Sequence, residues 1–63
     1  MKISLLEQIK CVQREVALRR RVYKNRVAMK QMSQAQADEE IDRMCAVLDT
    51  LNAARAKELL GRD

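Results

Sequence analysis

The sequence predicts an all-α fold, an antiparallel hairpin of two helices. The chain of 63 residues has no Pro, one Gly and one aromatic residue, whereas turn-rich β folds need all three residue types. Apolar residues make up 48% and charged residues 35% of the chain, a composition typical of long helices. Leu, Ile, Val and Met recur throughout, which argues against a disordered chain.

The first helix is predicted over residues 3–31. One row of apolar residues has helical spacing and forms its core face: Leu5, Ile9, Val12, Val16, Tyr23 and Val27. A second row lies more than 90° around the same helix: Cys11, Leu18, Val22 and Met29. A two-helix hairpin has little core, so we expect this second row to be a dimer or partner interface. Scattered surface apolar residues are the alternative interpretation.

The second helix is predicted over residues 34–60, after a turn at 32–33. Ser33 is the expected N-cap, and Gln36 completes a capping box. Acidic residues follow near the positive end of the helix dipole: Asp38, Glu39, Glu40 and Asp42. The core row of this helix is Ile41, Met44, Cys45, Leu48, Leu51 and Leu59. In an antiparallel hairpin Val27 then lies near Ile41, and Ile9 near Leu59.

Residues 1–63 are therefore expected to form one domain that dimerises into a four-helix bundle. The sequence has no His, no Gly-rich phosphate loop and no cluster of ligands, so we expect no catalytic residues, no cofactor and no metal site. Cys11 and Cys45 are expected to lie too far apart for a disulfide. Glu7 and Lys10 interrupt any signal-peptide pattern, and we expect a cytoplasmic protein with reduced cysteines and no membrane segment.

Positive charge is concentrated in the first half of the chain. Residues 1–33 carry nine Lys or Arg against two acidic residues, while residues 34–63 carry four against seven. On a helix, four of these cations follow one another along a single side, which we call the basic ridge: Lys10, Arg14, Arg21 and Lys24. The ridge suits an acidic protein surface or phosphates.

Three interpretations of the basic segment 19–26 remain open. It is a solvated face partly neutralised by the acidic start of the second helix, a contact for an acidic protein, or a contact for nucleic acid. The modest net charge of +4 speaks against nucleic acid. So does the single aromatic residue, Tyr23, which falls on the predicted core face.

Three segments carry a resemblance to a known group of proteins: EVALRRRVY (15–23), MSQAQADEEI (32–41) and MCAVLDTL (44–51). Together they resemble small, mostly uncharacterised helical proteins encoded by bacteriophages and prophages. Relatives of that group often have Pro and Gly where this chain has Lys24 and Lys30. Without the Pro, the first helix should run straighter, and without the Gly its end is less sharply specified. A single helix running through Ser33 and pairing with another chain is therefore the alternative architecture.

The resemblance implies a phage-type accessory protein in a bacterial host cell. Combined with the missing catalytic groups, it predicts a protein that binds and modulates or inhibits a host protein involved in defence, transcription or regulation. The alternative prediction is a nucleic-acid-binding protein that uses the basic ridge in phage replication or gene control.

Overall fold

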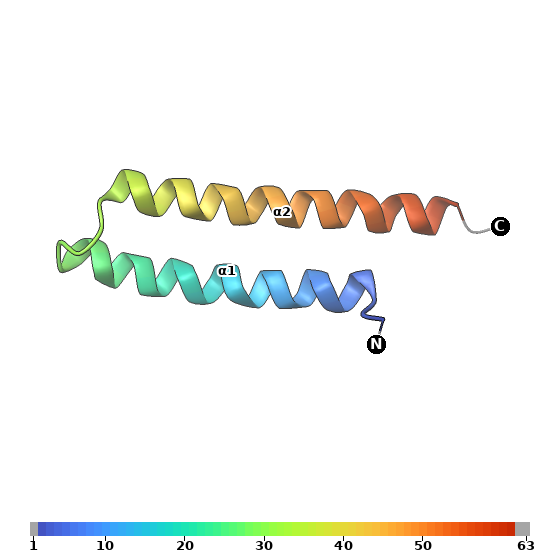
Figure 1. Ribbon diagram of the computed structural model, residues 1–63, viewed down its shortest axis with the longest axis horizontal. Helices are drawn as coiled ribbons and strands as arrows, with labels where there is room; N and C mark the ends of the chain where they lie inside the picture. Colours follow the sequence, from blue (N-terminus) through green and yellow to red (C-terminus); the bar gives the residue numbers. More distant parts are fainter. Residues whose placement is uncertain (1, 62–63) are drawn as a thin grey trace.

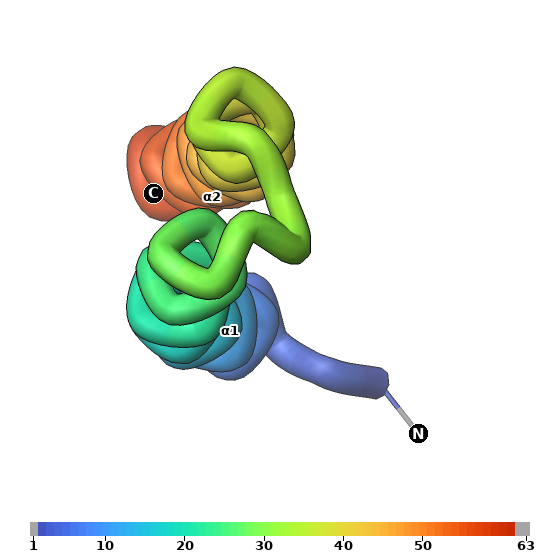
Figure 2. Tube along the Cα trace, turned by 90° about the vertical axis from the view of Figure 1, so that its left-hand side faces the viewer, coloured from blue at the N-terminus to red at the C-terminus, as the bar shows by residue number. Residues whose placement is uncertain are grey.

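Two helices make up the protein. The structure is a computed structural model and describes residues 2–61. Helix α1 spans Leu5–Ala28 and helix α2 spans Gln34–Leu60. They run antiparallel, side by side, in a rod of 52 × 22 × 15 Å (Figure 1). Figure 2, an end-on view, shows the two helices stacked and joined by one reversal of the chain. The predicted all-α hairpin is thus confirmed, and the continuous helix through Ser33 is not formed.

Helix α1 begins with a capping box that the sequence analysis missed. The Ser4 hydroxyl accepts a hydrogen bond from the Glu7 backbone N–H at 3.1 Å, and the Glu7 carboxylate accepts one from the Ser4 N–H at 3.3 Å. Together these bonds satisfy two backbone donors that the first turn otherwise leaves free. The helix therefore starts at Leu5, two residues later than predicted. The Ser-x-x-Glu spacing of residues 4–7 was the sequence signal for this helix start.

Helix α1 ends at Ala28, three residues earlier than predicted, because Lys30 adopts a left-handed backbone conformation with φ of 60°. The Lys30 N–H donates to the Val27 carbonyl at 3.0 Å, and the Gln31 N–H donates to the Arg26 carbonyl at 2.8 Å. This pair of bonds is a Schellman motif, which usually has Gly at the left-handed position. The connection between the helices is therefore residues 29–33, and it carries backbone strain at Lys30.

The start of helix α2 agrees with the prediction. Ser33 is the N-cap, its hydroxyl accepts from the Gln36 N–H at 3.0 Å, and the Gln36 side chain accepts from the Ser33 N–H at 3.1 Å. The acidic residues contribute less to this helix start than expected, because the first of them, Asp38, falls beyond the first turn. The dipole effect is confined to that turn, so capping rather than charge fixes this helix start.

The core between the helices is thin. Within residues 2–61, the buried apolar side chains are Ile9, Val16, Ala37 and Ile41, each of which keeps 4 to 9% of its surface exposed. Ala37 was not predicted, because an Ala in an Ala/Gln-rich stretch gives no apolar pattern, yet its small side chain allows α1 and α2 to approach. Val27 lies near Ile41 as predicted, and Tyr23 is half-buried beside both. Few side chains therefore hold the hairpin closed.

The register differs from the prediction at the open end of the hairpin. The Arg20 guanidinium donates to the Cys45 Sγ at 3.7 Å, so this long side chain reaches one turn beyond Ile41, with which it lines one pocket. Ile9 is buried whereas Leu59 is exposed, so the expected pairing of Ile9 with Leu59 does not form. Leu59 is 52% exposed because the last turns of α2 extend past the start of α1 (Figure 1).

Candidate interaction surfaces

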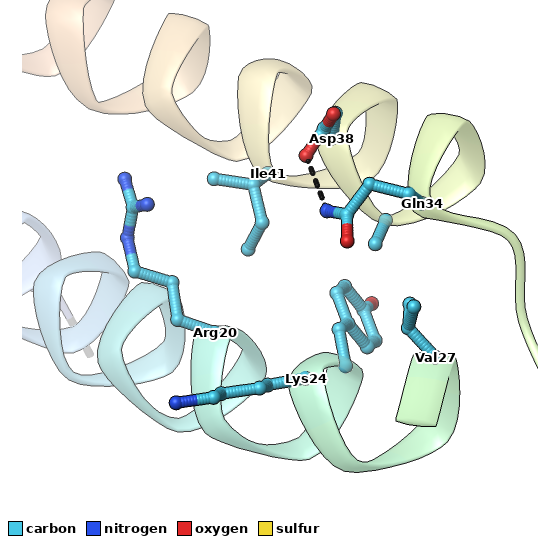
Figure 3. Close-up of a pocket in the computed structure, with 8 residues that line it drawn as sticks. Arg20, Lys24, Val27, Gln34, Asp38 and Ile41 are labelled. Atoms are coloured by element: carbon cyan, nitrogen blue, oxygen red, sulfur yellow. Dashed lines mark hydrogen bonds between the residues drawn. The ribbon is translucent and has the colours of Figure 1, made fainter. Parts of the chain in front are cut away.

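The groove between the helices opens on two sides, and one of them is charged. Arg20 and Lys24 of α1 and Gln34 and Asp38 of α2 line this side (Figure 3). Arg20 reaches toward α2, Lys24 extends away from it, and the Gln34 side-chain amide donates to the Asp38 carboxylate at 2.9 Å. We call this the charged side; it is the side on which a cation of the basic ridge borders an acidic residue.

The basic ridge continues from the charged side onto the outer surface of α1. Its four side chains are all exposed: Lys10, Arg14, Arg21 and Lys24. Lys10 lies fourteen residues, or four helical turns, from Lys24 and so shares its side, while Arg14 and Arg21 lie further out. On α2, Asp42 follows Asp38 by four residues and is also exposed. A row of cations on one helix thus runs beside carboxylates on the other.

The opposite side of the groove is lined near the turn by Arg26 of α1 and Glu40 of α2. Val22 lies four positions before Arg26 and shares its side of α1, while Leu18, eight positions before Arg26, lies about 80° further round toward the outer surface. Seven residues after Glu40, Val47 shares its side of α2. Leu18 is 46% exposed and Val47 is 49% exposed. We call this the apolar side.

The predicted interface row extends the apolar side onto the outer surface of α1. Cys11 is exposed, Leu18 and Val22 follow it at steps of seven and four, and Met29 lies just beyond α1 as its C-cap residue with 68% exposure. The row therefore lies mostly on the outer surface of α1, turned away from α2, and Val22 is its member nearest to the groove.

The sequence analysis missed the second half of the apolar side. Met44, Val47 and Leu51 of α2 follow at steps of three and four, so they adjoin one another on the helix surface. Met44 and Leu51 are half-buried against α1, while Val47 is the most exposed of the three. The spacing was visible in the sequence, but Val47 does not belong to the core row and was left unassigned.

The expected pairing between the acidic start of α2 and the basic segment 19–26 is not found. Within residues 2–61, the ion pairs join Arg43 to Glu39 and Glu40, and Arg19 to Glu15. All three pairs lie within one helix, at i,i+3 or i,i+4 spacing. No ion pair in this part of the chain engages a residue of the basic ridge.

Two further properties bear on the kind of site, the grouping of possible metal ligands and the hydropathy of the helices. Among the residues that the structure describes, no three His, Cys, Asp or Glu side chains are grouped so that they could hold a metal ion. In the same part of the chain, neither helix has a stretch long and apolar enough to span a bilayer. Cys11 and Cys45 are both free thiols.

Comparison with known proteins yields no relative: no protein-family model, no curated protein and no solved structure matches this chain. The resemblance to phage and prophage proteins stays a prediction. The two surfaces on the hairpin are therefore the basis for a proposed function.

Proposed function

We propose that this chain is a small non-enzymatic accessory protein that works as a homodimer and acts by binding another protein. The partner presents an acidic surface to the basic ridge. In line with the phage-type resemblance, the setting is the cytoplasm of a bacterial host cell, and the outcome is inhibition or modulation of a host defence, transcription or regulatory protein. The ridge, exposed and outside every ion pair of residues 2–61, carries the proposal.

The composition of the charged side favours a protein over nucleic acid. Lys24 borders the same groove as Asp38, and Asp42 continues the acidic row along α2. A phosphate backbone that followed the groove would face these carboxylates, and like charges at close range oppose binding. A protein surface offers both signs of charge and is compatible with the mixed pattern.

Affinity capture from a bacterial lysate, with and without nuclease, tests the proposal. The test variant, Arg21→Gln/Lys24→Gln, removes two charges from the ridge. The control variant, Arg43→Gln/Lys57→Gln, removes the same residue types from exposed positions on α2. We expect the wild-type and control chains to retain one protein in the presence of nuclease and the test variant to lose it.

Two results would count against this proposal. Retention that disappears with nuclease, together with salt-dependent binding to duplex DNA at about 50 mM salt, would favour the nucleic-acid alternative. Equal retention of the protein by the test variant would show that the ridge is not the binding surface.

A further inference from the structure

The hairpin exposes more surface than a compact protein of its size. Its accessible surface is 5304 Å². A folded monomer of 7.3 kDa is expected to expose about 4,200 Å². The excess of about 1,100 Å² is larger than the roughly 800 Å² that each partner buries in a standard protein–protein interface. The hairpin therefore has enough uncovered surface for one interface of standard size.

One continuous row on the outer surface of α1 consists of residues spaced alternately by four and three positions, which keeps their side chains on one face of a helix. Its apolar members are the predicted interface row, in which Leu18 is 46% and Met29 is 68% exposed. Leu18 and Val22 are also the part of the apolar side that α1 contributes. Glu15 and Asn25 occupy the positions between the apolar members. We call these six residues the outer seam: Cys11, Glu15, Leu18, Val22, Asn25 and Met29.

The spacing of the outer seam is the same in both directions along the helix. Its steps are four, three, four, three and four residues, so it is symmetric about the level of residue 20. A second copy of α1 that runs antiparallel, related by a twofold axis perpendicular to the helix at that level, places each seam position opposite its mirror position. These levels depend only on the rise of about 1.5 Å per residue along one helix.

The apolar members of the seam match each other across this axis. Cys11 of one copy lies opposite Met29 of the other, and Leu18 lies opposite Val22. Each of these two pairs forms twice, once on each side of the axis. All four apolar positions therefore face apolar positions, and the exposed surface of Leu18 and Met29 is covered.

The polar members of the seam also match and favour the antiparallel orientation. Glu15 of one copy lies opposite Asn25 of the other, whose side-chain amide can donate to the carboxylate. Arg26 of the other copy is level with Glu15 to within one residue and on the same flank of the seam, so it adds an opposite charge. In a parallel pair, the two Glu15 carboxylates would face each other, and like charges at close range oppose association.

We infer that the outer seam of α1 binds the outer seam of a second copy of this chain, antiparallel, about a twofold axis at the level of residue 20. This inference rests on the homodimer of the proposed function and specifies its interface. The four helices then lie side by side with the two copies of α1 in the middle. All neighbouring helices are antiparallel, which is favourable for their dipoles.

The basic ridge stays exposed in this dimer. Its four cations lie on one flank of the seam, and an axis perpendicular to the helices keeps that flank on the same face in both copies. The two ridges therefore adjoin on one face of the dimer. Their like charges oppose association, and an acidic partner bound across both ridges offsets this repulsion. Dimerisation and the binding of an acidic partner thus favour each other.

Disulfide trapping with the native Cys11 thiol tests this arrangement. One chain carries Cys45→Ser and keeps Cys11, and the other carries Cys11→Ser/Cys45→Ser/Met29→Cys. The chains are mixed, allowed to exchange subunits and oxidised; intact mass identifies the products, and circular dichroism checks that helicity is kept. We expect the disulfide that joins one chain of each type to dominate, because the two copies of Cys11 lie about 27 Å apart along the helix axis.

The other outcomes overturn different parts of the account. Efficient linkage of the Cys45→Ser chain to itself would contradict the antiparallel arrangement and leave the homodimer in place. No linkage, with the wild-type chain sedimenting at twice 7.3 kDa, would overturn the seam as the interface and also leave the homodimer in place. A wild-type chain that sediments at 7.3 kDa at all concentrations would overturn this inference and the homodimer together.

A second pair of variants checks the polar contact independently. Asn25→Asp opposes a second carboxylate to Glu15 of the other copy, whereas Gln13→Glu adds the same charge at an exposed position on the opposite side of α1. We expect Asn25→Asp to raise the dissociation constant of the dimer about tenfold and Gln13→Glu to leave it nearly unchanged. Adding Glu15→Gln to Asn25→Asp should recover most of the loss. Equal effects of Asn25→Asp and Gln13→Glu would contradict the pairing of Asn25 with Glu15.

Discussion

The two sides of the hairpin groove expose different kinds of side chain to water. On one side, Leu18 and Val47 are each about half exposed, near Val22 and Leu51. On the other, Lys24 and Asp38 border the groove and remain solvated. Both sides are built on the same two helices and separated only by a thin core. Under the proposed function, the apolar side serves self-association and the basic ridge serves other partners.

Weakening the core affects both sides at once, so it should cause the largest loss in the free energy of unfolding. Ile41 is buried against α1, and its replacement in Ile41→Ala leaves a cavity. We expect a loss of about 2 to 5 kcal/mol in the free energy of unfolding. Urea denaturation followed by circular dichroism measures it. Because folding and association are coupled, variant and wild type are compared at one protomer concentration. A loss below about 1 kcal/mol would contradict the assignment of Ile41 to the core.

An added negative charge should affect dimerisation differently on the two surfaces. Leu18→Asp puts a carboxylate on the apolar side, and Arg21→Asp puts one on the basic ridge of the same helix, three residues away. We expect Leu18→Asp to weaken dimerisation by about 2 kcal/mol, roughly thirtyfold. Arg21→Asp should leave dimerisation almost unchanged. Sedimentation across a range of concentrations measures both, and a larger effect of Arg21→Asp would reverse the roles of the two surfaces.

The connection that aligns the two sides contains a strained residue. Lys30 adopts φ of 60°, a conformation that Gly takes without steric cost. We expect Lys30→Gly to stabilise the hairpin by about 0.5 to 1 kcal/mol, since relief of strain outweighs the added freedom of the unfolded chain. Lys30→Ala is the control, because Ala keeps the strain. Thermal unfolding of the two variants should differ in that direction, and equal stability would show that Lys30 is not strained in solution.

The exposed ion pairs within α2 should contribute least to the free energy of unfolding. Arg43 pairs with Glu39 and Glu40, and all three side chains are largely solvated. Exposed pairs at this spacing contribute only a few tenths of a kcal/mol. We expect Arg43→Gln to change the free energy of unfolding by less than about 0.5 kcal/mol. Urea denaturation at low and at high salt checks this, and a change above 1 kcal/mol would indicate that Arg43 has a structural role.

Local signals in the sequence predicted much of this fold. The Ser33–Gln36 capping box fixed the start of α2, and apolar residues at helical spacing placed Ile9, Val16 and Ile41 in the core. The end of α1 was harder to predict, because it depends on a left-handed residue and Lys rarely takes that role. By contrast Gly61, the C-cap residue of α2, has φ of −81° and does not take the left-handed conformation that Gly adopts easily.

The interaction surfaces were only half predictable. The row on α1 and the basic ridge follow from spacing along one helix. Which side of the groove each occupies depends on how the two helices pack, and the expected pairing of Ile9 with Leu59 was wrong because the end of α2 extends past the start of α1. Val47 was missed because it lies outside the core row of α2 and is about half exposed.

The central claim is that the outer seam of α1 is covered by a second copy of the chain. Sedimentation equilibrium of the wild-type protein at micromolar concentration tests it most directly. The account predicts a helical species of twice 7.3 kDa that dissociates only on dilution. A folded, fully helical species that remains at 7.3 kDa at all concentrations would contradict it.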